Sequence, residues 1–106
     1  METEFSITCR SADHGPHVVT VVGELDVGTI AAFREFLLAL DGEVELDCAG
    51  LEFIDSAGLC ELVAYYRRLG STGGKLKLTN VSGACWRVLE ITGLTEVLQA
   101  SRAPTS

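Results

Sequence analysis

Ser56 and the acidic residue before it form the part of this chain best suited to chemistry. The segment Asp55-Ser56-Ala57-Gly58 follows an apolar stretch and opens a helix-like pattern of apolar residues. A serine at the start of a helix lies beside unpaired backbone N–H groups, and the helix dipole there favours negative charge. A phosphate on Ser56 would be tolerated by the fold, whereas a partner docked over it would be affected. We therefore expect the function of the chain to lie at this segment, although a serine in this position can also be a simple helix cap.

A hydrolase nucleophile is one alternative role for Ser56. The nucleophile elbow of α/β-hydrolases reads G-x-S-x-G, whereas this segment reads I-D-S-A-G and has Ile54 in place of the first glycine. A general base would have to be His14 or His17, and both precede the serine, whereas hydrolase triads place the histidine after it. The pattern argues against an enzyme.

A phosphoacceptor aspartate of the response-regulator type is a second alternative. Such receivers need adjacent acids after their first strand and a lysine after a late strand. Here Glu24 and Asp26 are separated by Leu25, and no lysine follows Lys77. The chain also has no phosphate-binding loop, dinucleotide fingerprint or zinc-ligand spacing, so neither a cofactor nor a metal is predicted.

The elements that must position Ser56 alternate along the chain. Apolar periodicity and turn residues predict strands at 5–10, 18–22, 44–48 and 75–79. Helices are predicted to begin after Asp26 or Thr29, at Ser56 and after Ser82, with 95–99 as a last strand or turn. We expect one α/β domain over 1–106, with a core at 5–99 and a flexible tail at 100–106. Its sheet should be mixed and mostly parallel, with an antiparallel N-terminal strand and helices packed against it.

Spacings of three and four residues assign the inner faces of the first two helices. The first helix should bury Ile30, Phe33, Leu37 and Leu40. The second should bury Leu59, Leu62, Val63, Tyr66 and Leu69. The link before Ser56 is expected to be irregular and anchored by Leu51, Phe53 and Ile54. Gly58 inside a first helical turn costs about 1 kcal/mol relative to alanine, which indicates a close approach by another backbone.

The composition of the chain limits the kinds of partner that it can bind and the cellular compartment in which it works. A net charge of −7 with scattered basic residues argues against nucleic acid. No apolar stretch approaches the roughly 20 residues that span a bilayer, so no association with a membrane is expected. The first four residues are acidic, whereas a signal peptide begins with basic residues, so we expect a cytoplasmic protein. The four cysteines have no C-x-x-C spacing and are expected to be buried, reduced thiols.

An ordered set of motifs resembles a known family. These motifs are Gly23-Glu24-Leu25-Asp26, Leu46-Asp47, Phe53-Ile54-Asp55-Ser56-Ala57-Gly58-Leu59, Gly74-Lys75-Leu76-Lys77-Leu78 and Ile91-Thr92-Gly93-Leu94. Together they span nearly all of residues 5–99 and resemble a STAS domain of the anti-sigma factor antagonist type. The chain departs from many members at Ala57, where a second serine or threonine is common, and at Trp86, where members are often polar.

The resemblance implies a partner-switching regulator. A kinase-type, ATP-binding anti-sigma factor would bind the unmodified chain, release sigma factor and phosphorylate Ser56, and a PP2C-type phosphatase would reverse the modification. Asp26 and Asp55 would shape the acceptor loop. Ala57, Gly58 and Leu59 would begin the helix that the partner covers. The protein would act as a monomer or weak dimer.

A different role remains open on the same resemblance. The chain would then be a constitutive STAS subunit or scaffold of a transporter or signalling complex, in which Ser56 is structural and unmodified. Ser56 would serve only as a helix cap in that case.

Overall fold

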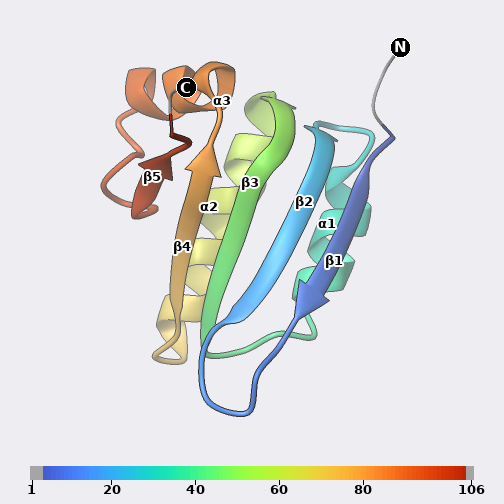
Figure 1. Cartoon of the computed structure of the whole chain (residues 1–106), viewed down its shortest axis with the longest axis vertical. Helices are drawn as coiled ribbons and strands as arrows, with labels where there is room; N and C mark the ends of the chain where they lie inside the picture. The colour runs from blue at the N-terminus through green and yellow to red at the C-terminus, as the bar shows by residue number, and fades with distance from the viewer. Residues whose placement is uncertain (1–3, 105–106) are drawn as a thin grey trace.

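A five-stranded sheet and three helices make up the computed structural model, which describes residues 4–104 (Figure 1). The elements in chain order are β1 (Ser6–Arg10), β2 (His17–Leu25), α1 (Ile30–Leu37), β3 (Glu43–Ile54), α2 (Ser56–Ser71), β4 (Lys75–Val81), α3 (Gly83–Ile91) and β5 (Ala100–Arg102). Strand order in the sheet follows chain order, with β1 antiparallel to β2 and every other pair parallel. The mixed α/β fold predicted from the sequence is confirmed.

The helices α1 and α2 lie against one face of the sheet, and α3 lies near the ends of β3 and β4 (Figure 1). Alternation along β2 places Val19, Val21 and Leu25 under the helices, and all three are buried. The opposite face is polar, and its register sets Glu45 of β3 beside Lys77 of β4. One covered and one solvated face explain the alternating pattern of these strands.

The strand β3 is longer than the sequence predicted. The segment expected to be an irregular link continues as strand up to Ile54, with register shifts against β2. Leu51 and Ile54 are buried as expected, but Phe53 is 44% exposed and does not anchor the core. The register shifts absorb the irregularity that the sequence suggested, because a bulge lets a strand continue past a break in its alternation.

The buried face of α2 is rotated from the one that the sequence predicted, since Leu59 and Val63 are only half-buried. Leu62 and Leu69 are buried, but Tyr65 lies with them, whereas Tyr66 is 37% exposed. Gly58, Leu62, Tyr65 and Leu69 recur at four, three and four residues, which is the helical period. The sequence pattern places Tyr66 on the inner face because it lies three residues after Val63. Val63 itself is only half-buried, so this spacing does not follow the buried face.

A last strand follows residue 99. The segment 95–99 forms turns rather than a strand, and Ala100–Arg102 pairs with β4 as β5. The prediction of a flexible tail is therefore wrong for 100–102, because Leu98 is buried and the amide of Ala103 donates to the Val81 carbonyl at 2.9 Å. Residues 105–106 of that tail, and residues 1–3 at the other end, lie outside the described residues.

The cysteines divide into two pairs. Cys48 and Cys85 are buried, as predicted, and burial raises the pKa of Cys48 to about 12. Cys9 and Cys60 are exposed, so the prediction of buried thiols is wrong for these two. Within residues 4–104, no helix is both long and apolar enough to cross a membrane.

Candidate functional site

Two loops meet at the ends of β2 and β3. The strands run parallel and pair Leu25 with Ile54, so the residues that follow them, Asp26 and Asp55, leave the sheet at the same edge. The amide of Asp55 donates to the Leu25 carbonyl at 3.1 Å and holds the two loops together. Parallel pairing thus brings Asp26 and Ser56 into one region, although 30 positions separate them in sequence.

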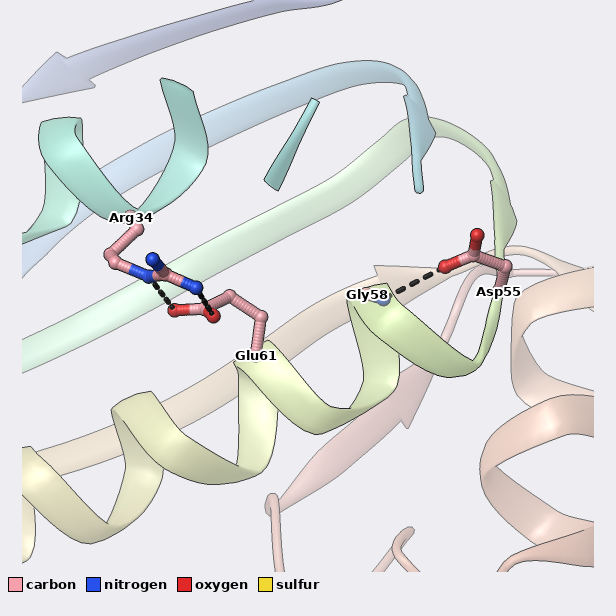
Figure 2. A network of polar contacts seen from close by, with 4 residues as sticks. All are labelled: Arg34, Asp55, Gly58 and Glu61. Atoms are coloured by element: carbon pink, nitrogen blue, oxygen red, sulfur yellow. Dashed lines mark hydrogen bonds and ion pairs between the residues drawn. The ribbon is translucent and has the colours of Figure 1, made fainter. Parts of the chain in front are cut away.

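Asp55 is the N-cap of α2. Its Oδ1 accepts a hydrogen bond from the Gly58 amide at 2.8 Å (Figure 2). Its Oδ2 accepts from the amide of Val27, in the neighbouring loop, at 3.3 Å. One carboxylate therefore satisfies a first-turn amide of α2 and links the loop after β2 to the start of the helix.

Asp26 organises its own loop rather than capping α1. Its Oδ1 accepts from the amide of Gly28 at 2.9 Å, which is the geometry of an Asx turn. The N-cap of α1 is Thr29, the second of the two predicted positions, and its hydroxyl donates to the Glu24 carbonyl at 2.8 Å. The carboxylates of Asp26 and Asp55 both accept from backbone amides, and within residues 4–104 neither makes a hydrogen bond to the Ser56 hydroxyl.

Ser56 is exposed at the first helical position of α2. Its hydroxyl takes part in none of the side-chain hydrogen bonds of residues 4–104, so it is not the cap that a purely structural role would require. The Ser56 and Ala57 amides likewise receive no cap from a side chain in this described part of the chain. The helix start therefore offers a free hydroxyl beside free N–H donors, an arrangement that suits an anion.

Gly58 is buried against the end of β2. A Cβ on Gly58 would overlap the Leu25 carbonyl oxygen and would lie 3.0 Å from its carbonyl carbon. The close backbone approach predicted from a glycine at this position is thus confirmed. Because Gly58 is covered by Leu25, it positions the helix start and presents no side chain to a partner.

Exposed or half-buried apolar side chains occur on the segments that meet at this edge of the sheet. Val27 is 76% exposed in the loop after β2, and Phe53 is 44% exposed just before Asp55. Along α2, Ala57 and Leu59 are half-buried. A groove of about 340 Å³ runs beside this helix and is lined by Leu59, Cys60, Val63, Ala64, Arg67 and Leu94.

Of these residues, Ala57 and Leu59 were predicted to contact a partner, whereas Val27, Phe53 and the rest of the groove lining were not. Periodicity assigned Val63 to the inner face of the helix, and Phe53 was expected to anchor the link before Asp55. Val27 lay in a loop with no periodicity. The one available signal for Leu94 was its place in the motif Ile91-Thr92-Gly93-Leu94, which gives no spatial position.

An ion pair joins α1 to α2 below the loops. Arg34 donates to both carboxylate oxygens of Glu61, at 3.1 and 2.7 Å (Figure 2). The guanidinium lowers the pKa of Glu61 through this hydrogen bond and its charge. Because Arg34 is 57% exposed, water screens the pair and its contribution to stability is small.

Replacing Glu61 with glutamine should make stability less dependent on pH in the acid range. A carboxyl group whose folded pKa is lowered stabilises the fold above the unfolded pKa and loses that contribution as pH falls through the folded pKa. The unmodified chain should unfold at a higher urea concentration than Glu61→Gln, by an amount that is constant near neutral pH. This difference in urea midpoint should disappear as the pH falls below about 4.5. A gap that persists in stronger acid would contradict this assignment.

The fold and the loop pair define a small mixed α/β domain with an exposed serine at the head of a helix. The family model described as "Mlab, STAS domain" matches residues 9–99. The chain therefore belongs to the STAS domain family.

Named relatives and solved structures agree with that assignment. The chain is 31% identical to an anti-sigma-B factor antagonist of Bacillus subtilis (strain 168) over 86 residues, or 78% of this chain and 79% of the relative. A crystal structure of an anti-sigma factor antagonist from Mycobacterium paratuberculosis superposes with a TM-score of 0.80 at 29% identity, covering 96% of this chain and 87% of that one. Antagonising a factor is a binding role, in line with the prediction that the chain is not an enzyme.

More distant structures share the fold alone. The phosphorylated form of the Bacillus cell fate determinant SpoIIAA has a TM-score of 0.70 at 20% identity and covers 91% of each chain. Part of the murine anion transporter Slc26a9 has a TM-score of 0.72 at 16% identity, covering 94% of this chain and 21% of the transporter. The fold therefore occurs both in small regulators and inside transporters.

Proposed function

We propose that this chain is a cytoplasmic anti-sigma factor antagonist switched off by phosphorylation of Ser56. The unmodified form binds a kinase-type anti-sigma factor and so releases sigma factor. The kinase uses ATP to phosphorylate Ser56, and a PP2C-type phosphatase restores the hydroxyl. The names of the relatives support the antagonist role, and the exposed, unbonded Ser56 hydroxyl at the head of α2 is the observation on which the switch rests.

The partner surface in this proposal surrounds the serine. Val27, in the loop after β2, and Phe53, near the end of β3, supply exposed apolar area, and the groove along α2 supplies more between Leu59 and Leu94. Apolar residues that a fold leaves exposed and contiguous are typical of protein-binding surfaces. Asp26 and Asp55 contribute by fixing the loop backbones rather than by their own contact.

Phosphorylation would act on the complex more than on the fold. A phosphoserine adds about −1.5 to −2 charges at neutral pH. Inside the protein, the Ser56 and Ala57 amides and the α2 dipole offset part of that charge. A partner surface docked over Val27 and Phe53 has no such compensation and would have to desolvate the phosphate.

The test is to map the phosphate on the reconstituted system. The chain is purified with its bound ATPase, which is identified by mass spectrometry, expressed separately and incubated with the chain and ATP. We expect one phosphate on Ser56, none on the Ser56→Ala variant, and full modification of the Ser71→Ala variant. Ser71 is a matched control because it is an exposed serine on the same helix. Phosphate that persists on Ser56→Ala would refute the acceptor assignment.

A constitutive subunit of a transporter or scaffold is the second candidate. The family model's description names Mlab, and the same fold occurs within an anion transporter. In that role Ser56 stays unmodified and the partner remains bound whatever charge stands at this position. An unphosphorylated Ser56 in a stable complex with an ATPase would favour this candidate over the switch.

A further inference from the structure

Side chains of Cys9, Ser11 and His17 form a hydrogen-bonded chain at the turn between β1 and β2. The Sγ of Cys9 lies 3.4 Å from the Oγ of Ser11, and the same Oγ lies 2.6 Å from Nδ1 of His17. A thiol, a hydroxyl and an imidazole in this order can pass a proton from the sulfur to the ring nitrogen. A base that reaches the proton of a nucleophile, directly or through one bridging group, can activate that nucleophile.

The register of the hairpin brings these three side chains together. The antiparallel pairing of β1 with β2 sets Cys9 opposite Val19. Continued one position past the end of β1, the same register sets Ser11 opposite His17. Residues two apart in a strand share a face of the sheet, and directly opposed residues share it as well. The contact of the three groups therefore follows from the backbone of the hairpin.

The thiol of Cys9 is open to a small molecule, because Cys9 and Ser11 are exposed and His17 is half-buried. Cys60 on α2 is exposed as well. Within residues 4–104, however, the thiol of Cys60 takes part in no hydrogen bond, whereas the thiol of Cys9 does. The two accessible cysteines thus differ in whether a base is connected to the sulfur.

We propose that Cys9 is a thiol–disulfide exchange site that takes a low-molecular-weight disulfide as its substrate and becomes reversibly thiolated. The thiol proton passes to the Oγ of Ser11 as the hydroxyl proton passes to Nδ1 of His17. The resulting thiolate, which is the nucleophilic form, attacks one sulfur of the disulfide. A new S–S bond to Cys9 forms, the S–S bond of the substrate breaks, and the departing thiolate takes the proton from the imidazolium. The substrate is the oxidant, and half of it leaves reduced as a thiol.

The exchange site is separate from the serine. His17 begins β2, and Leu25, which accepts from the Asp55 amide, ends it. A strand of nine residues is about 26 Å long. In Figure 1 the turn between β1 and β2 and the start of α2 lie at opposite ends of the sheet. A small group attached to Cys9 therefore leaves Ser56 uncovered.

The test compares the two exposed cysteines in the same purified, reduced chain, with hydroxyethyl disulfide as an uncharged probe. The chain is incubated with excess probe near neutral pH and quenched with acid at intervals. Mixed disulfides on Cys9 and Cys60 are then quantified by peptic digestion and mass spectrometry. General-base assistance contributes about 10²–10⁴-fold in active sites, and water competes with the relay at an exposed site, so we expect Cys9 to react about tenfold faster than Cys60 or more. Equal or faster modification of Cys60 would overturn the proposal.

Substitutions in the relay test its mechanism. Ser11→Ala and His17→Gln should each slow thiolation of Cys9 to about the rate of Cys60, because each removes a group that the proton must cross. Ser11→Thr keeps the hydroxyl and should react as the unmodified chain does. The rate at Cys60 should be the same in all three variants.

An unchanged rate at Cys9 in Ser11→Ala or His17→Gln would show that the relay does not serve the thiol, and would also overturn the proposal. The comparison of Cys9 with Cys60 needs no variant, so the proposal stays testable even where a substitution disturbs the hairpin. None of these results bears on phosphorylation of Ser56, so the two proposals fail independently.

Discussion

Replacing Ser56 with aspartate will weaken binding to the anti-sigma factor at least tenfold while leaving the domain folded. Aspartate carries one negative charge against about −1.5 to −2 for phosphoserine, so stoichiometric phosphorylation should weaken binding more, by about a hundredfold. A hundredfold corresponds to about 3 kcal/mol, the range seen when a charge is left unpaired at an interface. The measurement is isothermal titration of each form with the purified partner.

Stability measured on the same variant separates a switch from general damage. An acid in the first turn of α2 interacts favourably with the helix dipole, by about 0.3–1 kcal/mol. Ser56→Asp should therefore unfold in urea at the same midpoint as the unmodified chain or a slightly higher one. Ser71→Asp, the matched control at the other end of α2, should bind the partner normally. Normal partner binding by Ser56→Asp would instead favour the constitutive subunit.

The order of elements could be predicted from the sequence because each has a clear period. Val18 to Val22 is a β-branched run, and Phe33 and Leu37 recur at helical spacing. Parallel topology then brings the ends of β2 and β3 together, so the meeting of Asp26 with the loop of Asp55 followed from fold class. Local pattern and global topology agreed at these positions.

Tertiary packing decided the features that the sequence did not predict. Tyr65 and Tyr66 are adjacent and chemically alike, and only the rotation of α2 on the sheet buries the first. Phe53 is apolar in a strand, yet it is 44% exposed while its neighbour Ile54 is buried, in a part of β3 whose register shifts against β2. The side that Phe53 faces depends on strand register, and the burial of Tyr65 depends on helix rotation. A short apolar pattern can misplace a residue by one position in either case.

Gly58→Ala will destabilise the domain by about 2 kcal/mol, although alanine is the better helix former. Propensity alone predicts a gain of about 1 kcal/mol from this change. The added methyl group would overlap the Leu25 carbonyl oxygen, which is held in place by the Asp55 amide at 3.1 Å. Neither partner can turn aside as a flexible side chain would, and overpacking of this kind costs about 1–3 kcal/mol or more. The cost of this steric overlap should therefore exceed the gain in helix propensity, and the variant should be less stable than the unmodified chain.

Gly70→Ala supplies the matched control on the same helix. A Cβ on Gly70 would meet no atom within 4 Å, so this variant should be as stable as the unmodified chain or up to about 1 kcal/mol more stable. Urea unfolding of both variants compares the two environments directly. Equal stability of Gly58→Ala and Gly70→Ala would show that β2 and α2 can separate at no cost. The Asp55 cap would then lack the rigid support that holds Ser56 at the surface, because Gly58 donates the amide that the cap accepts.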